Sequence, residues 1–109
     1  MKETSKFRSG FQKTQEKKGY TFNRETRLTA RILNGLVANR ERYGYMACPC
    51  RLATGERKTD TPIICPCDYR DDDVKEHGTC YCGLFVSNEN KDKDFSGVKV
   101  PERHVYEDA

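Results

Sequence analysis

All six cysteines of the chain lie between residues 48 and 82, where they form three Cys-x-Cys pairs. The pairs are Cys48-Pro49-Cys50, Cys65-Pro66-Cys67 and Cys80-Tyr81-Cys82. This stretch also holds three of the four prolines and no long apolar run, so it can bury little hydrocarbon. Thiolates bind metals, and metal binding can supply the folding free energy that a thin core lacks. The cysteine stretch therefore indicates a fold built around a metal centre.

The number of thiols leaves several arrangements open. Four thiolates are the usual ligand set of a 4Fe-4S cluster, and the remaining two could form one redox-active disulfide. Three disulfides would require an oxidising compartment, whereas the N-terminal sequence Met-Lys-Glu-Thr-Ser-Lys lacks the apolar core of a secretory signal. Zinc sites more often use Cys-x2-Cys spacing. We interpret the stretch as an iron-sulfur redox site in a cytoplasmic protein.

Proline inside two of the pairs restricts the local backbone. Pro49 and Pro66 each fix φ and lack an N–H group. The thiols on either side are thereby held in a defined relation. One thiol of a pair could ligate iron while its neighbour lies close enough to exchange electrons with the cluster.

The order of the pairs resembles the catalytic subunit of ferredoxin:thioredoxin reductase, whose pattern is Cys-Pro-Cys, Cys-Pro-Cys and then Cys-His-Cys. The resemblance includes the helix-like segment 22–43 and the run Cys-Gly-Leu-Phe-Val at 82–86, and it covers most of the chain from about Phe7. Carried over position by position, it implies a 4Fe-4S cluster bound by Cys48, Cys65, Cys67 and Cys80. It also implies a catalytic disulfide between Cys50 and Cys82.

The resemblance implies an oxidoreductase that passes electrons from ferredoxin, through the cluster and the adjacent disulfide, to thioredoxin or a similar protein disulfide. A ferredoxin delivers one electron at a time, whereas opening a disulfide takes two. A second small subunit, as in plant-type members, could accompany the chain. The residues also leave open a simple 4Fe-4S electron-transfer protein and a zinc-binding interaction module.

One position departs from the family pattern. Tyr81 stands where plant-type members have histidine, so the source of a catalytic proton has to be sought elsewhere. His77, three residues before Cys80, could donate it, or it could be a surface histidine at a helix end. Tyr81 could also donate a proton, but the ordinary tyrosine pKa near 10 makes packing its default role.

The sequence around Cys50 suggests why this thiol would react. Pro49 can begin a short helix that runs to Gly55, which would place Cys50 near a helix N-terminus. That location, and Arg51 beside it, would lower the Cys50 pKa and favour the thiolate. We expect Cys50 to attack the substrate disulfide, although Arg51 could equally be an ordinary surface residue.

The length of 109 residues predicts a single domain over 1–109, with residues 1–6 as a flexible tail. We expect a small, mainly α-helical fold with minor β structure, wrapped around the 4Fe-4S cluster. In the segment 22–43, Asn23 can cap a helix, apolar residues recur at helical spacing, and Gly44 gives a stop.

Shorter elements are expected in the second half of the chain. The segment before Gly78 predicts a short helix that begins with acidic residues, and 83–86 predicts an extended segment. Pro101 argues against a long terminal helix, but 102–108 could form a short one.

Charge is distributed unevenly along the sequence. Residues 1–58 carry 14 Lys and Arg against 5 Asp and Glu, while residues 59–109 carry 6 against 12. A basic face could steer an acidic redox partner such as a ferredoxin, although a solvated surface of mixed charge explains the imbalance equally well. Nucleic-acid binding lacks motif support, and no apolar run is long enough to cross a membrane.

Overall fold

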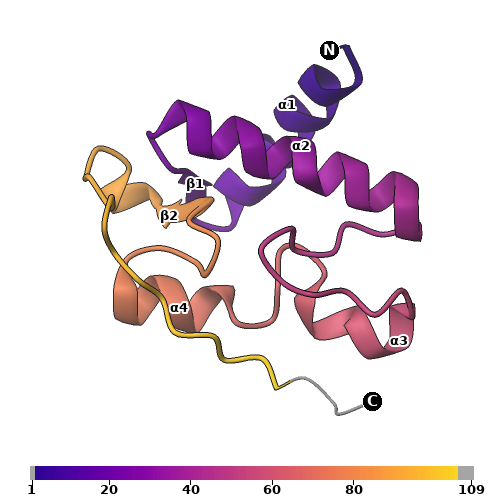
Figure 1. Ribbon diagram of the computed structural model, residues 1–109. Helices are drawn as coiled ribbons and strands as arrows, with labels where there is room; N and C mark the ends of the chain where they lie inside the picture. The colour runs from indigo at the N-terminus through magenta and orange to yellow at the C-terminus, as the bar shows by residue number, and fades with distance from the viewer. Residues whose placement is uncertain (1, 106–109) are drawn as a thin grey trace.

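The structure is a computed structural model, and it describes residues 2–105. Helices α1 and α2 and a two-stranded sheet form one half of the molecule, and the cysteine-bearing loops with α3 and α4 form the other (Figure 1). In chain order the elements are α1 (Lys2–Lys17), β1 (Tyr20–Phe22), α2 (Thr26–Tyr43), α3 (Arg57–Asp60), η1 (Thr61–Ile63), α4 (Arg70–His77), β2 (Phe85–Ser87) and η2 (Asn88–Asn90). The predicted small, mostly helical fold with minor β structure is confirmed.

Helix α2 is the predicted long helix, with a different N-terminus. The side chain of Glu25, not Asn23, caps it by accepting a hydrogen bond from the Arg27 N–H. Asn23 instead connects the segment before α2 with the loop of the third cysteine pair. Its Nδ2 donates to the Gly83 carbonyl at 2.9 Å. The helix ends at Gly44, whose φ of 87° is the left-handed conformation that favours glycine.

Helix α1 reaches into the segment that we expected to be a flexible tail. It begins at Lys2, so residues 2–6 are helical, and it continues through Gly10. Phe7 and Phe11 stack with ring centroids 5.1 Å apart and pack against the core. One turn of spacing places both aromatic rings on the same side of the helix, which fixes α1 to the domain.

The two strands form an antiparallel pair in the register Tyr20↔Ser87, Thr21↔Val86 and Phe22↔Phe85. The pair of Phe22 and Phe85 contributes to a core that continues into the cysteine region. The core cluster consists of Phe22, Ile32, Leu33, Leu36, Cys65, Val74, Cys80, Leu84 and Phe85. Two cysteines are therefore part of the hydrophobic core.

The cysteine-bearing half is mostly irregular. Pro49 and Cys50 form a tight turn, in which the Arg51 N–H donates to the Cys48 carbonyl at 3.1 Å, and residues 49–55 contain no helix. The predicted helix from Pro49 to Gly55 is therefore wrong. The predicted helix before Gly78 is confirmed as α4, with Gly78 at φ 90° as its C-cap.

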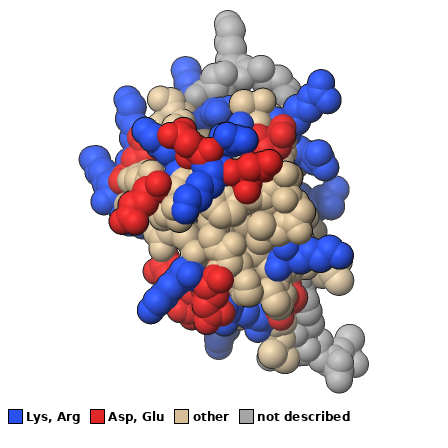
Figure 2. Space-filling view, turned by 90° about the vertical axis from the view of Figure 1, so that its left-hand side faces the viewer, with Lys and Arg blue, Asp and Glu red and all other residues tan. Residues whose placement is uncertain are grey.

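The C-terminal segment crosses α4, as the yellow chain in Figure 1 shows. Residues 102–105 have no helical structure, so the expected short helix is absent there, and residues 106–109 lie outside the described residues. No helix within residues 2–105 combines the length and the apolar character that crossing a membrane requires. On the face shown in Figure 2, basic and acidic side chains alternate around an area with few charges.

Candidate functional site

Five of the six cysteines line one pocket between the two halves of the molecule. Its walls are formed by Cys48, Arg51, Cys65, Cys67, Arg70, Cys80, Tyr81, Cys82 and Phe85. The four cysteines that the family resemblance implies as cluster ligands are all in this set. Thiols separated by up to 32 positions in the sequence therefore face a common space.

Short backbone pairing holds the first two cysteine pairs side by side. The Cys48 N–H donates to the Ile63 carbonyl at 2.8 Å, and the Cys65 N–H donates to the Met46 carbonyl at 2.8 Å. These bonds flank an antiparallel bridge between residues 47 and 64. The pairing fixes the two Cys-Pro-Cys segments relative to each other without regular strands.

The third pair is held by the turn that precedes β2. The Gly83 N–H donates to the Cys80 carbonyl at 2.8 Å, and the Cys80 N–H donates to the Phe85 carbonyl at 3.2 Å. The Phe85 N–H also donates to the Cys80 sulfur at 3.3 Å. A hydrogen bond to a sulfur stabilises its thiolate form, so this backbone contact favours the anionic form of Cys80.

Exposure differs among the six thiols, all of which are free. Cys48, Cys65 and Cys80 are buried, Cys67 and Cys82 are half-buried, and Cys50 is exposed. The sulfurs of Cys80 and Cys82 lie 3.9 Å apart. Cys50 is thus the thiol that a large partner can reach.

Contacts among the thiols shift their pKa values. The Cys50 pKa is lowered to about 4, because hydrogen bonds from the Cys48 and Cys82 thiols stabilise its thiolate, and Arg51 adds a smaller effect of the same sign. The pKa of Cys82 is raised, mainly through its hydrogen bonds with Cys48 and Cys50. The Cys50 pKa is lowered, as the sequence predicted. The main cause is the pair of neighbouring thiols and not a helix N-terminus, because no helix begins there.

Two arginines are buried in the pocket walls: Arg51, which the sequence suggested as a neighbour that lowers the Cys50 pKa, and Arg70, which the sequence did not single out. The Arg51 side chain forms an ion pair with Glu102, with 2.9 Å between Nε and Oε1. The Cζ of Arg70 lies 4.0 Å from the ring centroid of Tyr20 and 4.9 Å from that of Phe85. No local pattern reveals the burial of either arginine, because their partners are distant in sequence.

The two candidate proton donors differ in location. Tyr81 lines the pocket, and burial raises its pKa. His77 ends α4, with its Nε2 3.8 Å from a Glu76 oxygen, and is not among the residues that line the pocket. The other histidine of the chain, His104, has its Nδ1 2.9 Å from the Tyr69 hydroxyl. A proton-donor role for His77 or Tyr81 stays a prediction.

An open groove of about 330 Å³ adjoins the cysteine turn, with Pro49 and Arg51 on either side of Cys50 in its wall. Its lining consists of Gly35, Ala38, Asn39, Arg42, Tyr43, Pro49, Arg51, Leu52 and Ala53. Leu52 is 77% exposed, so it presents an apolar side chain to solvent at this groove. The groove thus lies beside the exposed thiol.

Comparison with known proteins agrees with this geometry. Residues 1–105 match the family model described as ferredoxin thioredoxin reductase catalytic beta chain. The ferredoxin-thioredoxin reductase catalytic chain of Guillardia theta is 32% identical over 90 residues, which are 80% of this chain and 81% of the relative. The catalytic chain of Porphyra purpurea is 30% identical over 84 residues, covering 74% and 68%. The chain therefore belongs to the family of ferredoxin thioredoxin reductase catalytic beta chains, which are oxidoreductases.

Proposed function

We propose that this chain is an iron-sulfur disulfide reductase that takes electrons from ferredoxin and delivers them to thioredoxin or a similar protein disulfide. The observation that carries the proposal is the arrangement of the thiols: five line one buried pocket, and the sixth, Cys50, is exposed at its edge. A zinc-binding module or a simple electron carrier needs no exposed thiol beside such a pocket.

The pocket residues fit a 4Fe-4S cluster by the chemistry of their donor set. The proposed ligands are Cys48, Cys65, Cys67 and Cys80. Among residues 2–105, no group of three or more His, Cys, Asp or Glu side chains has the arrangement of a metal-ion site. A 4Fe-4S cluster does not need such convergence, because each thiolate binds a different iron. When bound there, the cluster would supply one-electron chemistry.

Cys50 and Cys82 would perform the exchange of thiols and disulfides. The Cys50 thiolate attacks one sulfur of the substrate disulfide, which forms a mixed disulfide and releases the other substrate sulfur as a thiolate. The Cys82 thiolate then attacks the Cys50 sulfur, which restores the Cys50–Cys82 disulfide and releases the second substrate thiol. Two electrons from two ferredoxins, with protons from solvent or a protein donor, reduce this disulfide for the next turnover.

The direction of electron flow is favourable for the proposed partners. A plant-type ferredoxin near −400 mV and a thioredoxin near −270 mV differ by about 130 mV, or roughly 6 kcal/mol for two electrons. The groove beside Cys50 is the surface on which the disulfide substrate would bind. A second small subunit and a cytoplasmic location stay predictions.

Anaerobic analysis of iron, zinc and acid-labile sulfide tests the proposed function. The expected result is iron and sulfide in a roughly four-to-four ratio per chain, together with a visible absorption spectrum. Reduced ferredoxin should then support reduction of a thioredoxin disulfide by the iron-loaded protein. Stoichiometric zinc from cells supplied with iron would contradict the proposal and favour the interaction module. Iron without an exchangeable disulfide would favour the simple electron carrier.

A further inference from the structure

Arg51 carries a buried charge whose hydrogen-bonding capacity is only partly used. Its side chain is fully buried, and its Nε donates to the Glu102 carboxylate at 2.9 and 3.0 Å. The two terminal nitrogens are buried as well and make no hydrogen bond among the described residues. A charged donor that is buried without a partner loses the hydrogen bonds that it would make with water. The placement of Arg51 therefore calls for a negative group in the pocket.

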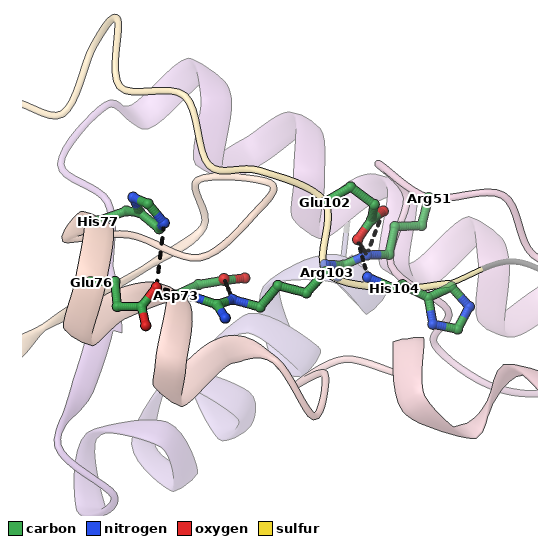
Figure 3. Close-up of polar contacts among 7 residues, drawn as sticks. All are labelled: Arg51, Asp73, Glu76, His77, Glu102, Arg103 and His104. Atoms are coloured by element: carbon green, nitrogen blue, oxygen red, sulfur yellow. Dashed lines mark hydrogen bonds and ion pairs between the residues drawn. The ribbon is translucent and has the colours of Figure 1, made fainter.

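Three residues from other parts of the chain hold the guanidinium in place. Its Cζ lies 4.4 Å from the ring centroid of Tyr81 and 5.2 Å from that of Tyr69. Glu102 approaches from the C-terminal segment, which crosses between α4 and the loop that carries Arg51 (Figure 3). Contacts with two aromatic rings and the hydrogen bond from Nε to the Glu102 carboxylate together hold the guanidinium in place.

Arg51 lines the cysteine pocket together with five cysteines. Burial acts to lower the pKa of Arg51, but the hydrogen bond to Glu102, with smaller contributions from Cys67 and Cys48, outweighs burial and raises this pKa. Arg70 lines the same pocket, so two cations face the proposed cluster.

We propose that Arg51 sets the potential at which the pocket accepts electrons, by holding a fixed positive charge against the cluster and its Cys67 ligand. This inference rests on the proposed function, in that a cluster occupies the pocket. Potentials of iron-sulfur sites depend on net charge, on hydrogen bonds to the sulfurs and on exposure to solvent. An electron added to the site increases its negative charge, so a buried cation beside it favours the reduced state.

Tyr81 acts in this proposal as a positioning residue. It occupies the position at which the family pattern has histidine, and its ring face lies against the guanidinium. A neutral aromatic face attracts a cation, whereas a protonated imidazole would repel it. The departure from Cys-His-Cys to Cys-Tyr-Cys thus matches a site in which the positive charge comes from Arg51.

Redox titration of the iron-loaded protein, followed by visible absorbance at one fixed pH, tests the proposal. Arg51→Gln removes the charge and should shift the midpoint potential to a more negative value. Arg51→Lys keeps a charge and should shift it less. Glu102→Gln removes a negative charge beside Arg51, so it should shift the potential in the opposite, positive direction.

Arg103→Gln is the matched control. It removes the other attachment of the C-terminal segment, in which Arg103 contacts Asp73 and Glu76, but leaves Arg51 in place. If Arg51 had a purely structural role, Arg51→Gln, Glu102→Gln and Arg103→Gln would all loosen the C-terminal segment and shift the midpoint potential in the same direction. The proposal requires opposite shifts for Arg51→Gln and Glu102→Gln and none for Arg103→Gln.

Two results would overturn the inference: an iron-loaded Arg51→Gln protein with the wild-type potential, or shifts of the same sign in Arg51→Gln and Glu102→Gln. If Arg51→Gln does not retain the cluster, Glu102→Gln decides, because an unchanged or more negative potential contradicts the proposal and a positive shift supports it. A wild-type protein that binds zinc would overturn the proposed function as well, which separates the two failures.

Discussion

Gly35 in α2 lies directly against Pro49 of the first cysteine pair. A Cβ at residue 35 would stand 2.7 Å from the proline Cβ and 3.1 Å from its Cγ. The helix and the cysteine turn can approach this closely only because residue 35 has no side chain. Cys48 and Cys50 flank Pro49, so the contact fixes how two thiols of the site stand relative to the core.

Gly35→Ala should therefore destabilise the protein even though alanine is the better helix former. Helix propensity favours alanine by about 1 kcal/mol, but overpacking costs about 1–3 kcal/mol. We expect a net loss in the free energy of unfolding and poorer retention of iron, measured by denaturant unfolding and metal analysis. Gly10→Ala is the control, because nothing lies within 4 Å of a Cβ there and the change should be neutral or stabilising. Equal free energies of unfolding for the two variants would show that the turn at Pro49 can move away from residue 35 without loss of stability.

Asp60 organises the loop between the first two cysteine pairs. It is 1% exposed and accepts hydrogen bonds from the Tyr45 hydroxyl at 2.5 Å, from the Thr54 N–H at 3.0 Å and from the Gly55 N–H at 3.1 Å. Asp60→Asn should lower the free energy of unfolding by about 2–4 kcal/mol, because hydrogen bonds to a charged group contribute about 1.5–3 kcal/mol. Tyr45→Phe removes one donor and should cost less. A loss in Asp60→Asn no larger than in Tyr45→Phe would contradict this role.

The same carboxylate predicts a dependence of stability on pH. Burial acts to raise the pKa of Asp60, but the hydrogen bonds from Tyr45, Thr54 and Gly55 outweigh it and lower the pKa below 3.8. A lowered folded-state pKa stabilises the protein above the unfolded-state pKa, and this stability is lost as the pH falls through the folded-state pKa. Acid unfolding should therefore show a smaller pH dependence below about pH 4 in Asp60→Asn than in the wild type. Identical acid transitions would show that Asp60 titrates alike in both states.

Variants of single cysteines should show different effects for Cys50 and Cys82 than for the four proposed ligands. Cys50→Ser should reduce turnover with a disulfide substrate to background while retaining iron, because Cys50 is exposed and is the proposed attacking thiol, not one of the proposed ligands. Cys82→Ser should accumulate a mixed disulfide through Cys50, visible by mass spectrometry under non-reducing conditions. Cys65→Ser is the contrasting variant, since loss of a buried ligand should release iron. Normal turnover by Cys50→Ser would refute the assignment.

Leu52 offers a test of the groove beside Cys50. The side chain is 77% exposed, so Leu52→Ala should change the free energy of unfolding by less than about 0.5 kcal/mol. Loss of an apolar contact on binding should raise the KM for a thioredoxin disulfide by roughly 5-fold, from about 1 kcal/mol. The kcat should stay near that of the wild type. Val98→Ala is a suitable control, because Val98 is also exposed but does not line the groove. Equal KM values for both variants would place substrate binding elsewhere.

Local patterns in the sequence predicted the elements whose structure depends on near neighbours. The apolar residues of α2 recur at the helical period and bury one face, and Gly44 and Gly78 end α2 and α4 as the sequence predicted. The three cysteine pairs were sufficient to identify the family, because the spacing of thiols is itself a local pattern. The start of α2 was wrong, since the side chain of Asn23 is engaged by Gly83 far along the chain.

The sequence by itself determined which residue types are available: six thiols in three pairs, a long amphipathic helix and glycines at two helix ends. Only the tertiary structure decided how Arg51 is used, because its charge is buried by Tyr69, Tyr81 and Glu102, which lie between 18 and 51 positions away. Tertiary packing also replaced the expected helix at Pro49 with a turn held against Gly35. Contacts of this kind depend on which distant surfaces meet, and no periodicity within one segment contains that information.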